Sequence, residues 1–216
     1  QYWDANNSIL NISFEQRLDN AKTDKDIEMV IPILYSCYSR EKVGKPIVEN
    51  NLFVLDKNKK DLKINALSGE KNAPVLSIFR GFSSPVLWES DLSIDDYLYL
   101  FLNENDYFTR WDAGQFLMRK IIKTRLNNQE NDALEDRFIY AIKKSILDLK
   151  IKDPFFLATL LKIPGFSELE CLFEKVDPVS IYKESLNFQV SIGIKILQDL
   201  RELSENIFLN IDQKWP

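Results

Sequence analysis

Apolar and polar residues alternate along the first part of the chain, as they do in strands that bury one face. Leu10, Ile12 and Phe14 lie on one side of such a pattern, with polar residues between them. The same period of two predicts strands at 10–14, 29–33, 52–55, 62–66, 75–79 and 86–88. Turn-forming residues separate them at 4–7, 19–26, 43–46, 56–60, 67–69 and 83–85. Short strands at such close intervals predict an antiparallel sandwich, with Pro32 at an edge or a bulge.

After Leu92 the period becomes helical, and local capping chemistry marks where helices begin. Three stretches have a hydroxyl residue followed three positions later by an acid, the pattern of a capping box: Ser93–Asp96, Thr109–Asp112 and Ser167–Glu170. Two further starts place an aspartate before a proline, whose missing N–H costs nothing at the first helical position: Asp153-Pro154 and Asp177-Pro178. A sixth helix is predicted over 132–149, after the polar loop 127–131.

The change of period divides the chain into two expected domains. We predict a multi-domain fold, β then α, with an antiparallel β-sandwich over 1–91 and an irregular α-helical solenoid or bundle layer over 92–216. The apolar residues of the helix that begins at Pro178 are spread over more than one face, and such a helix is normally covered on two sides. We therefore expect 92–216 to be the N-terminal portion of a longer helical domain.

The composition excludes most catalytic chemistry. The 216 residues include no histidine, which rules out Ser-His-Asp triads and histidine-ligated metal sites, and the six glycines are too far apart for a phosphate-binding loop. Asp95, Asp96 and Asp112 are interpreted as helix-start acids. The lysine clusters 57–60 and 143–144 are interpreted as solvated surface, and the aromatic run 97–102 as a buried helix. We predict no catalytic, cofactor-binding or metal-binding residue in this chain.

Cysteine usage, charge and hydropathy indicate the expected cellular location and which partners are not expected. Cys37 and Cys171 are far apart in the sequence and are predicted to be buried and reduced, so a cytoplasmic location is expected. The net charge is −5 with no long run of basic residues, so we expect no nucleic-acid partner. The longest stretch without a charge, 29–39, is well short of the about 20 apolar residues of a membrane-spanning helix, so no membrane partner is expected.

Two stretches are more specific than general packing requires. Residues 77–86, SIFRGFSSPV, resemble the R-G-F-S-[AS]-P-V strand pair of the bacterial-type aminopeptidase N (alanyl aminopeptidase) family. Residues 105–113, NDYFTRWDA, resemble the N-D-x-F-x-R-W-[DE]-A helix start of the same family, in the same order and separation. Residues 2–14, 151–164 and 176–178 resemble it more loosely, so the resemblance covers nearly the whole chain.

The resemblance implies an immunoglobulin-like sandwich followed by the opening part of a C-terminal helical domain. Proteins of that family are zinc exopeptidases that release N-terminal residues from peptides, and their catalytic motifs, G-[AG]-M-E-N and H-E-x-x-H, have no counterpart in this sequence. The chain is then expected to be a scaffold that covers the active site, inactive alone, with the catalytic domain of the same polypeptide as its partner. That catalytic domain would bind the zinc ion and the peptide substrates.

Three residues of the two motifs are interpreted as structural. Arg80 and Arg110 are expected to pair with a neighbouring acid or carbonyl, and Trp111 is expected to anchor the sandwich to the first helix pair.

A free-standing adaptor is the main alternative, in which an exposed apolar helix face of the sandwich-plus-helices chain docks a protein partner. An H-E-x-x-H motif encoded upstream would exclude it. A carbohydrate-binding sandwich is weaker, because Trp3 and Trp88 are isolated from other aromatic residues.

Overall fold

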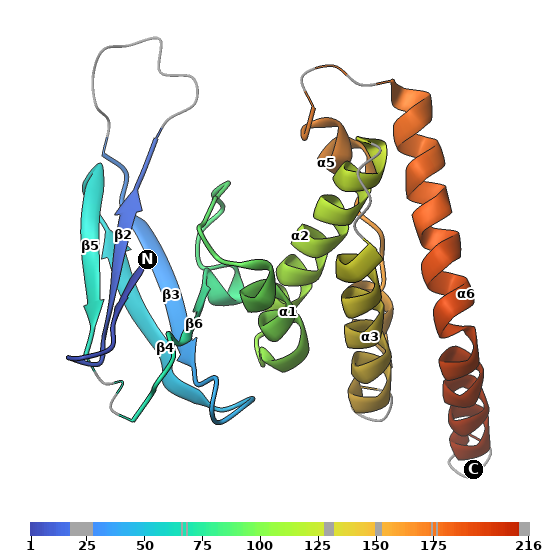
Figure 1. Cartoon of the computed structure of the whole chain (residues 1–216), viewed down its shortest axis with the longest axis horizontal. Coiled ribbons are helices and arrows are strands. Elements are labelled where there is room, and N and C mark those ends of the chain that lie inside the picture. The colour runs from blue at the N-terminus through green and yellow to red at the C-terminus, as the bar shows by residue number, and fades with distance from the viewer. Residues whose placement is uncertain are drawn as a thin grey trace. The chain divides into compact units, whose positions relative to one another are not determined.

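A computed structural model of the chain describes residues 1–17, 28–65, 67, 69–127, 132–149, 153–173, 175 and 177–211 (Figure 1). The chain forms two compact units, Gln1–Arg110 and Trp111–Pro216. The first unit therefore extends beyond the sandwich into the first helices, and a domain boundary between 91 and 92 stays a prediction. The predicted turn at 19–26 and most of the predicted loop 127–131 lie outside the described residues.

Two three-stranded antiparallel sheets form most of the first unit. Strands β1 (Tyr2–Asp4), β2 (Ile9–Glu15) and β5 (Lys59–Ile64) make one sheet, in the order β1-β2-β5. Strands β3 (Ile31–Tyr38), β4 (Pro46–Leu55) and β6 (Val75–Ile78) make the other, in the order β4-β3-β6. Both sheets supply side chains to one apolar core, among them Leu10, Ile12, Ile33, Cys37, Phe53, Ile64, Leu76 and Ile78. The predicted antiparallel sandwich is confirmed.

Pro32 lies in a part of β3 that is paired with a strand on one side. In the register with β4 it is opposite Val54, whereas β6 pairs with β3 only from Tyr35 to Tyr38. Beyond the end of β6, the Ser84 hydroxyl donates to the Pro32 carbonyl at 2.6 Å. Pro32 therefore lies where β3 is locally an edge of its sheet, as predicted. An edge suits proline because proline has no N–H to donate to a neighbouring strand.

Residues 86–88 do not form a strand, which corrects the sequence prediction. Their side chains do alternate: Leu87 is 97% exposed, while Val86 and Trp88 pack against the sandwich core. The backbone of 83–93 nevertheless joins no sheet, and the Val86 N–H donates to the Ser84 carbonyl at 3.0 Å. The alternation here comes from side chains that pack against the core, without backbone hydrogen bonds to a neighbouring strand. The motif at 80–86 is thus no strand pair, because β6 ends at Ile78 and a 3₁₀ turn, η1 (Arg80–Phe82), follows.

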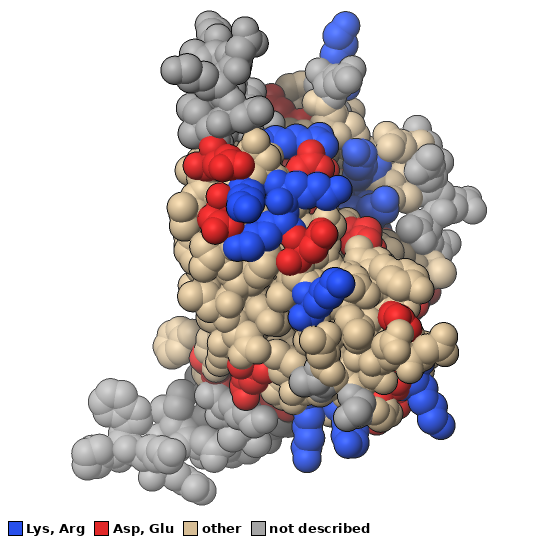
Figure 2. Space-filling model, turned by 90° about the vertical axis from the view of Figure 1, so that its left-hand side faces the viewer, with Lys and Arg blue, Asp and Glu red and all other residues tan. Residues whose placement is uncertain are grey.

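The face of the first unit formed by β1, β2 and β5 has basic and acidic side chains side by side (Figure 2). In the register of this sheet, Glu15 is opposite Lys59. Lys60 donates to Asp56 at 2.7 Å and its ammonium lies 5.4 Å from the centre of the Phe53 ring. The lysine cluster at 57–60 is therefore solvated surface, as predicted.

Six helices lie after the strands in the described part of the chain, as predicted. They are α1 (Ile94–Asn103), α2 (Tyr107–Leu126), α3 (Asp132–Leu149), α4 (Pro154–Leu160), α5 (Phe166–Glu170) and α6 (Pro178–Ile211). Helix α1 belongs to the first unit and buries part of the aromatic run, including Tyr97, Leu100 and Phe101. In the second unit α3 packs against α4 and α6, and α5 packs against α6. No helix among the described residues combines the length and the apolar character that crossing a membrane requires.

Three helix starts are capped as the sequence predicts. Ser93 and Asp96 form a capping box at α1, in which the Asp96 N–H donates to Ser93 Oγ at 3.2 Å and the Ser93 N–H donates to Asp96 Oδ2 at 2.9 Å. Asp153 accepts the N–H three residues later at 2.8 Å. Asp177 accepts the N–H groups two and three residues later at 3.1 and 3.2 Å. These bonds satisfy donors that have no partner within their helices.

The predicted start of α5 is wrong. The N-cap is Gly165, whose N–H donates to Glu168 Oε2 at 2.7 Å, so the box expected from Ser167 to Glu170 does not form. The helix begins earlier because the carboxylate of Glu168 already reaches back to a free backbone N–H.

One cysteine also differs from its prediction. Cys37 is fully buried, and burial raises the pKa of its thiol to about 12. Cys171 is exposed, because α5 buries only Leu169 and places the residue after the helix on the solvent side.

Candidate functional site

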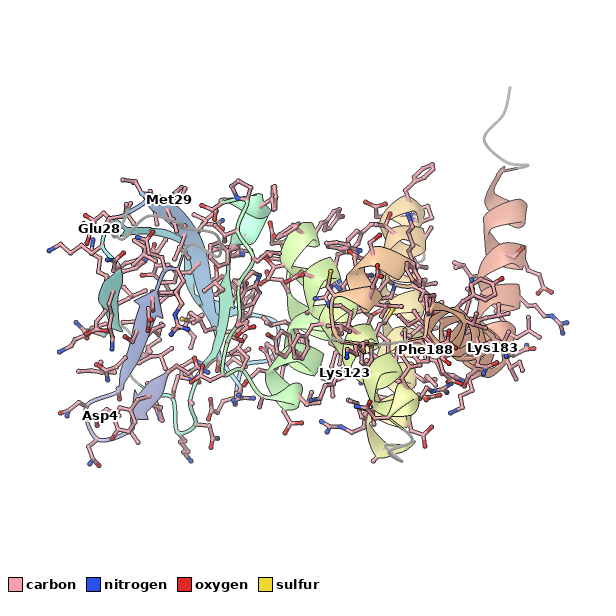
Figure 3. The ribbon with its side chains drawn as sticks, turned by 90° about the horizontal axis from the view of Figure 1, so that it is seen from above. Asp4, Glu28, Met29, Lys123, Lys183 and Phe188 are labelled. Atoms are coloured by element: carbon pink, nitrogen blue, oxygen red, sulfur yellow. The ribbon has the colours of Figure 1, made fainter. Side chains whose placement is uncertain are left out.

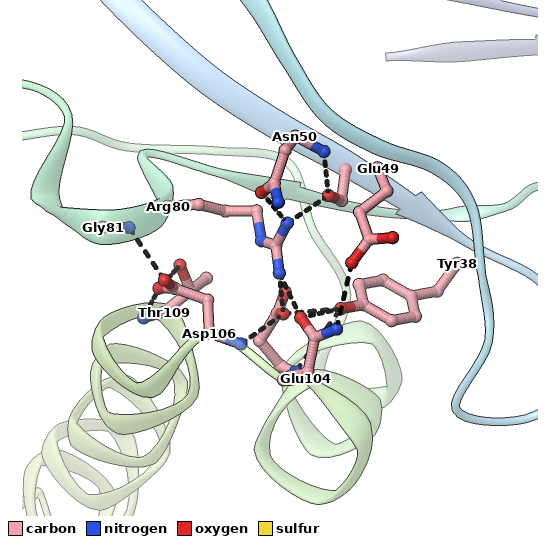
Figure 4. A network of polar contacts seen from close by, with 10 residues as sticks. Tyr38, Glu49, Asn50, Arg80, Gly81, Glu104, Asp106 and Thr109 are labelled. Carbon is pink, nitrogen blue, oxygen red and sulfur yellow. Dashed lines mark hydrogen bonds and ion pairs between the residues drawn. The ribbon is translucent and has the colours of Figure 1, made fainter.

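The two motifs of the sequence meet inside the first unit, at a buried arginine (Figure 4). Arg80 is 3% exposed and lies between the β4-β3-β6 sheet and the junction of α1 and α2. Its guanidinium forms an ion pair with Glu104 Oε1 at 3.1 Å and donates to Ser36 Oγ at 2.6 Å. It also donates to the side-chain oxygens of Asn50 and Asn105. One side chain thereby joins two strands to the end of a helix.

Glu104 is 1% exposed, and one of its carboxylate oxygens accepts three hydrogen bonds. Besides Arg80, the donors to Oε1 are the Tyr38 hydroxyl at 2.5 Å and the Asp106 N–H at 2.9 Å. Burial, together with the neighbouring carboxylate, raises the pKa of Tyr38 above its usual range. A buried carboxylate is tolerated where charge and hydrogen bonds compensate for the lost water. These three donors do so for Oε1, while the buried Oε2 has no hydrogen-bond partner.

Asp106 caps α2, and this corrects the predicted box at Thr109–Asp112. The Thr109 N–H donates to Asp106 Oδ1 at 2.9 Å, so the helix begins three residues before the sequence pattern placed its start. The second oxygen, Oδ2, accepts the Gly81 N–H at 3.0 Å. Asp112 lies inside α2, where desolvation by burial raises its pKa. One aspartate therefore both starts α2 and holds the turn after β6.

The turn after β6 has a strained backbone. Phe79, Gly81 and Phe82 have φ of 57°, 61° and 55°, in the left-handed region that side chains with a Cβ rarely adopt. For the two phenylalanines this conformation costs of order 1–3 kcal/mol each, and it persists only where its surroundings impose it. The Arg80 ion pair and the bond from Gly81 to Asp106 fix the turn on both sides, and the Phe82 ring lies 5.0 Å from that of Phe108.

Further contacts of the same kind hold α1 and the start of α2. Arg110 Nε donates to the Phe101 carbonyl at 2.8 Å. Arg40 forms an ion pair with Asp96 and donates to the Ala73 carbonyl at 2.7 Å. The expected pairing of Arg80 with an acid and of Arg110 with a carbonyl is confirmed, and the anchoring role of Trp111 stays a prediction. We call the contacts of Arg80, Glu104, Tyr38, Asn105 and Asp106 the clamp.

A second polar cluster joins helices of the second unit. Arg125 of α2 makes bidentate contacts of 2.7 to 3.0 Å with Glu135 of α3, and Ser191 of α6 donates to the same carboxylate at 2.9 Å. The guanidinium of Arg125 also lies 5.3 Å from the centre of the Phe188 ring. The predicted surface position of the lysines at 143–144 is confirmed, with Lys143 3.3 Å from an acid of α6. This cluster fixes how three helices pack.

The absence of catalytic residues from both clusters stays a prediction. The side chains of the clamp donate to and accept from one another, and the sequence has no histidine that could serve as a general base. Among the residues that the structure describes, no group of three or more cysteine and acidic side chains could hold a metal ion. The donors of the described residues therefore do not fit a zinc ion, which takes histidine nitrogen, cysteine sulfur and carboxylate oxygen ligands in sets of three or four.

The sequence matches two family models that divide it between them. Residues 1–91 match one described as a domain of unknown function (DUF3458) with an Ig-like fold. Residues 94–212 match one described as a domain of unknown function (DUF3458_C) with ARM repeats.

Two curated relatives are named aminopeptidase N. One, from Caulobacter vibrioides, is 29% identical over 167 residues, which is 77% of this chain and 19% of the relative. The other, from Escherichia coli, is 32% identical over 111 residues, which is 50% of this chain and 13% of the relative. The chain thus spans at most about a fifth of the length of either relative.

A solved structure has the same fold. The crystal structure of Legionella pneumophila aminopeptidase A in complex with aspartic acid superposes with a TM-score of 0.76 at 20% identity, over 94% of this chain and 22% of that one.

Proposed function

This chain belongs to the aminopeptidase N family, in which it carries the DUF3458 Ig-like and ARM-repeat domains, and on that premise we propose that it is a non-catalytic scaffold of a zinc-dependent aminopeptidase. The catalytic domain lies elsewhere in the same polypeptide and removes N-terminal residues from peptides. The sandwich and helices close over its active site and restrict entry to short peptides.

One observation carries the proposal: residues of both family motifs, Arg80, Asn105 and Asp106, meet in the clamp, where the charge of Arg80 is paired with the buried Glu104. Arg80 and Glu104 are at most 3% exposed, so neither is accessible to a peptide substrate. Their contacts hold the sandwich to α1 and to the first turn of α2. A connection of this kind suits a scaffold that holds the sandwich and the helices in place, while another domain carries out the reaction.

The proposal assigns the zinc ion to the catalytic domain of the parent. The donors of the described residues do not fit the ion, so the role proposed for this chain is to position the domains and not to activate water. The proposal includes a cytoplasmic location, which the two free cysteines support because unpaired thiols are usual in a reducing compartment.

The activity of the full-length parent protein tests the proposal. We expect it to hydrolyse aminoacyl anilides, to lose this activity to a zinc chelator, and to regain it when zinc is returned. Residues 1–216 alone are expected to be inactive in the same assay. Activity in residues 1–216 would refute the division of labour, and a full-length protein without peptidase activity would favour the adaptor.

A further inference from the structure

Three buried polar atoms at the clamp have no hydrogen-bond partner among the residues that the structure describes. They are Arg80 Nε, Glu104 Oε2 and the hydroxyl oxygen of Ser77. All three side chains belong to buried residues, and Ser77 is fully buried. A buried polar group without a partner is costly, so most such groups in proteins bond either to protein atoms or to an ordered water molecule. A partner outside the described side chains is therefore expected here.

The ion pair of Arg80 with Glu104 makes only half of a bidentate contact. Nη2 of the guanidinium lies 3.1 Å from Oε1 of the carboxylate. In the planar guanidinium the Nε–H lies on the same edge as Nη2, and in the carboxylate Oε2 lies beside Oε1. The unpaired Nε–H and the unpaired Oε2 are thus the remaining donor and acceptor of this one pair (Figure 4).

Other hydrogen bonds hold both groups in this arrangement. Nη1 of the guanidinium donates to Ser36 Oγ at 2.6 Å and to the side chain of Asn50, while Nη2 also donates to Asn105. Oε1 of the carboxylate accepts from the Tyr38 hydroxyl at 2.5 Å. A turn of the guanidinium that brought Nε to Oε2 would break the bonds to β3 and β4. A third molecule between Nε and Oε2 satisfies both atoms without that loss.

The hydroxyl of Ser77 faces the clamp from β6. In the register of β3 and β6, Ser77 is opposite Ser36. Residues opposite one another in an antiparallel pair have their side chains on the same face, with Cβ atoms about 4.5–5.5 Å apart. Leu76 and Ile78, on either side of Ser77, belong to the apolar core of the sandwich, so Ser77 points away from that core. Its hydroxyl therefore lies on the face where Ser36 bonds to Arg80.

The chemistry of the three atoms selects a small neutral ligand. The guanidinium of Arg80 only donates and would repel a metal cation, whereas the carboxylate of Glu104 only accepts and would repel an anion. A water molecule accepts from the first and donates to the second, and it can bond to a hydroxyl in either direction. Buried waters typically make about three hydrogen bonds, to polar groups that otherwise have no partner.

We propose that a water molecule is bound within the clamp, where it accepts from Arg80 Nε–H, donates to Glu104 Oε2 and bonds to Ser77 Oγ. Glu104 ends α1 and Ser77 lies in β6, so this water adds a second connection between the sandwich and the helix. It is then a structural component of the clamp. The inference concerns residues of this chain alone and goes beyond the proposed function.

A crystal structure of the full-length protein, at a resolution that places single waters, tests this inference. We expect one density peak within about 2.5–3.2 Å of Arg80 Nε, Glu104 Oε2 and Ser77 Oγ. The control in the same map is the ion pair beside Phe188 of α6 (Figure 3). There Arg125 Nε donates directly to Glu135 Oε2 at 3.0 Å, so no peak is expected between the two side chains.

The variant Ser77→Ala tests the third bond, because alanine removes the hydroxyl and adds no bulk. We expect the peak to remain between Arg80 and Glu104, which are the charged partners. Its displacement parameter, relative to the atoms of the guanidinium, is expected to rise because the water loses one of three bonds. An unchanged ratio would show that Ser77 does not bind the water.

Three results for the unmodified protein would overturn the inference. A direct bond from Arg80 Nε to Glu104 Oε2, without density between them, means that the clamp closes with no third molecule. A peak with contacts of about 2.0–2.6 Å means a metal cation. Density larger than one atom means a bound solute. Peptidase activity does not enter this measurement, so a failure of the proposed function is distinguishable from a failure here.

Discussion

Replacing Arg80 by methionine lowers the free energy of unfolding of the first unit by about 3–5 kcal/mol, the usual cost of removing one partner of a buried ion pair. The carboxylate of Glu104 would remain 1% exposed with its charge uncompensated. Ser36, Asn50 and Asn105 would each also lose a hydrogen bond from the guanidinium. Methionine keeps the apolar stem of the side chain, so the loss measures the charge and the hydrogen bonds. Urea unfolding followed by tryptophan fluorescence and circular dichroism gives the value.

Two further variants distinguish the effect of breaking the clamp from the effect of removing any positive charge. Arg17→Met breaks the exposed pair with Glu15, 2.8 Å apart, and is expected to change stability by less than about 0.5 kcal/mol. Adding Glu104→Gln to Arg80→Met removes the uncompensated charge and should recover part of the loss. Equal stability of Arg80→Met and the unmodified chain would show that the clamp does not hold the sandwich to α1.

Replacing Phe188 by alanine in residues 1–216 costs about 3–5 kcal/mol, the range for removing a large buried aromatic side chain. Phe188 of α6 is fully buried, and the guanidinium of Arg125 lies 5.3 Å from the centre of its ring. The loss combines the transfer of the ring to water with the cavity left behind. Thermal unfolding by circular dichroism, which follows the helices, measures it.

Val190 provides the matched control for this substitution, two residues further along the same helix. It is 52% exposed, so Val190→Ala in residues 1–216 is expected to change stability by less than about 0.5 kcal/mol. Similar losses at both positions would contradict the burial of Phe188 and the exposure of Val190 on α6.

The sequence predicts elements best where local chemistry and packing agree. Ser93 and Asp96 mark the start of α1 because both partners of the box are close in the chain, and the 3.6-residue period of α3 gives its bounds, Asp132–Leu149. The strand predicted at 86–88 fails for the opposite reason. Alternating burial of Val86 and Trp88 is what a strand shows, but a strand also needs a neighbour, which the sequence cannot reveal.

The clamp was only half visible in the sequence. Arg80 and Asp106 belong to the two motifs, so their importance could be read from the family resemblance. Tyr38 and Glu104 could not, because their roles depend on a hydrogen bond between residues 66 positions apart. A signal did exist at Glu104, an acid placed directly before the second motif and after a buried helix. The capping role of Asp106 was missed because Thr109 and Asp112 offered an equally good local pattern.

Zinc titration of purified residues 1–216 by isothermal titration calorimetry tests the central claim most directly, namely that this chain is a scaffold without a working centre of its own. The account predicts no stoichiometric site tighter than about 10 μM, an affinity of about 7 kcal/mol, because the sequence has no histidine and no set of side chains among the described residues suits the ion. One zinc ion bound per chain at nanomolar affinity would contradict it.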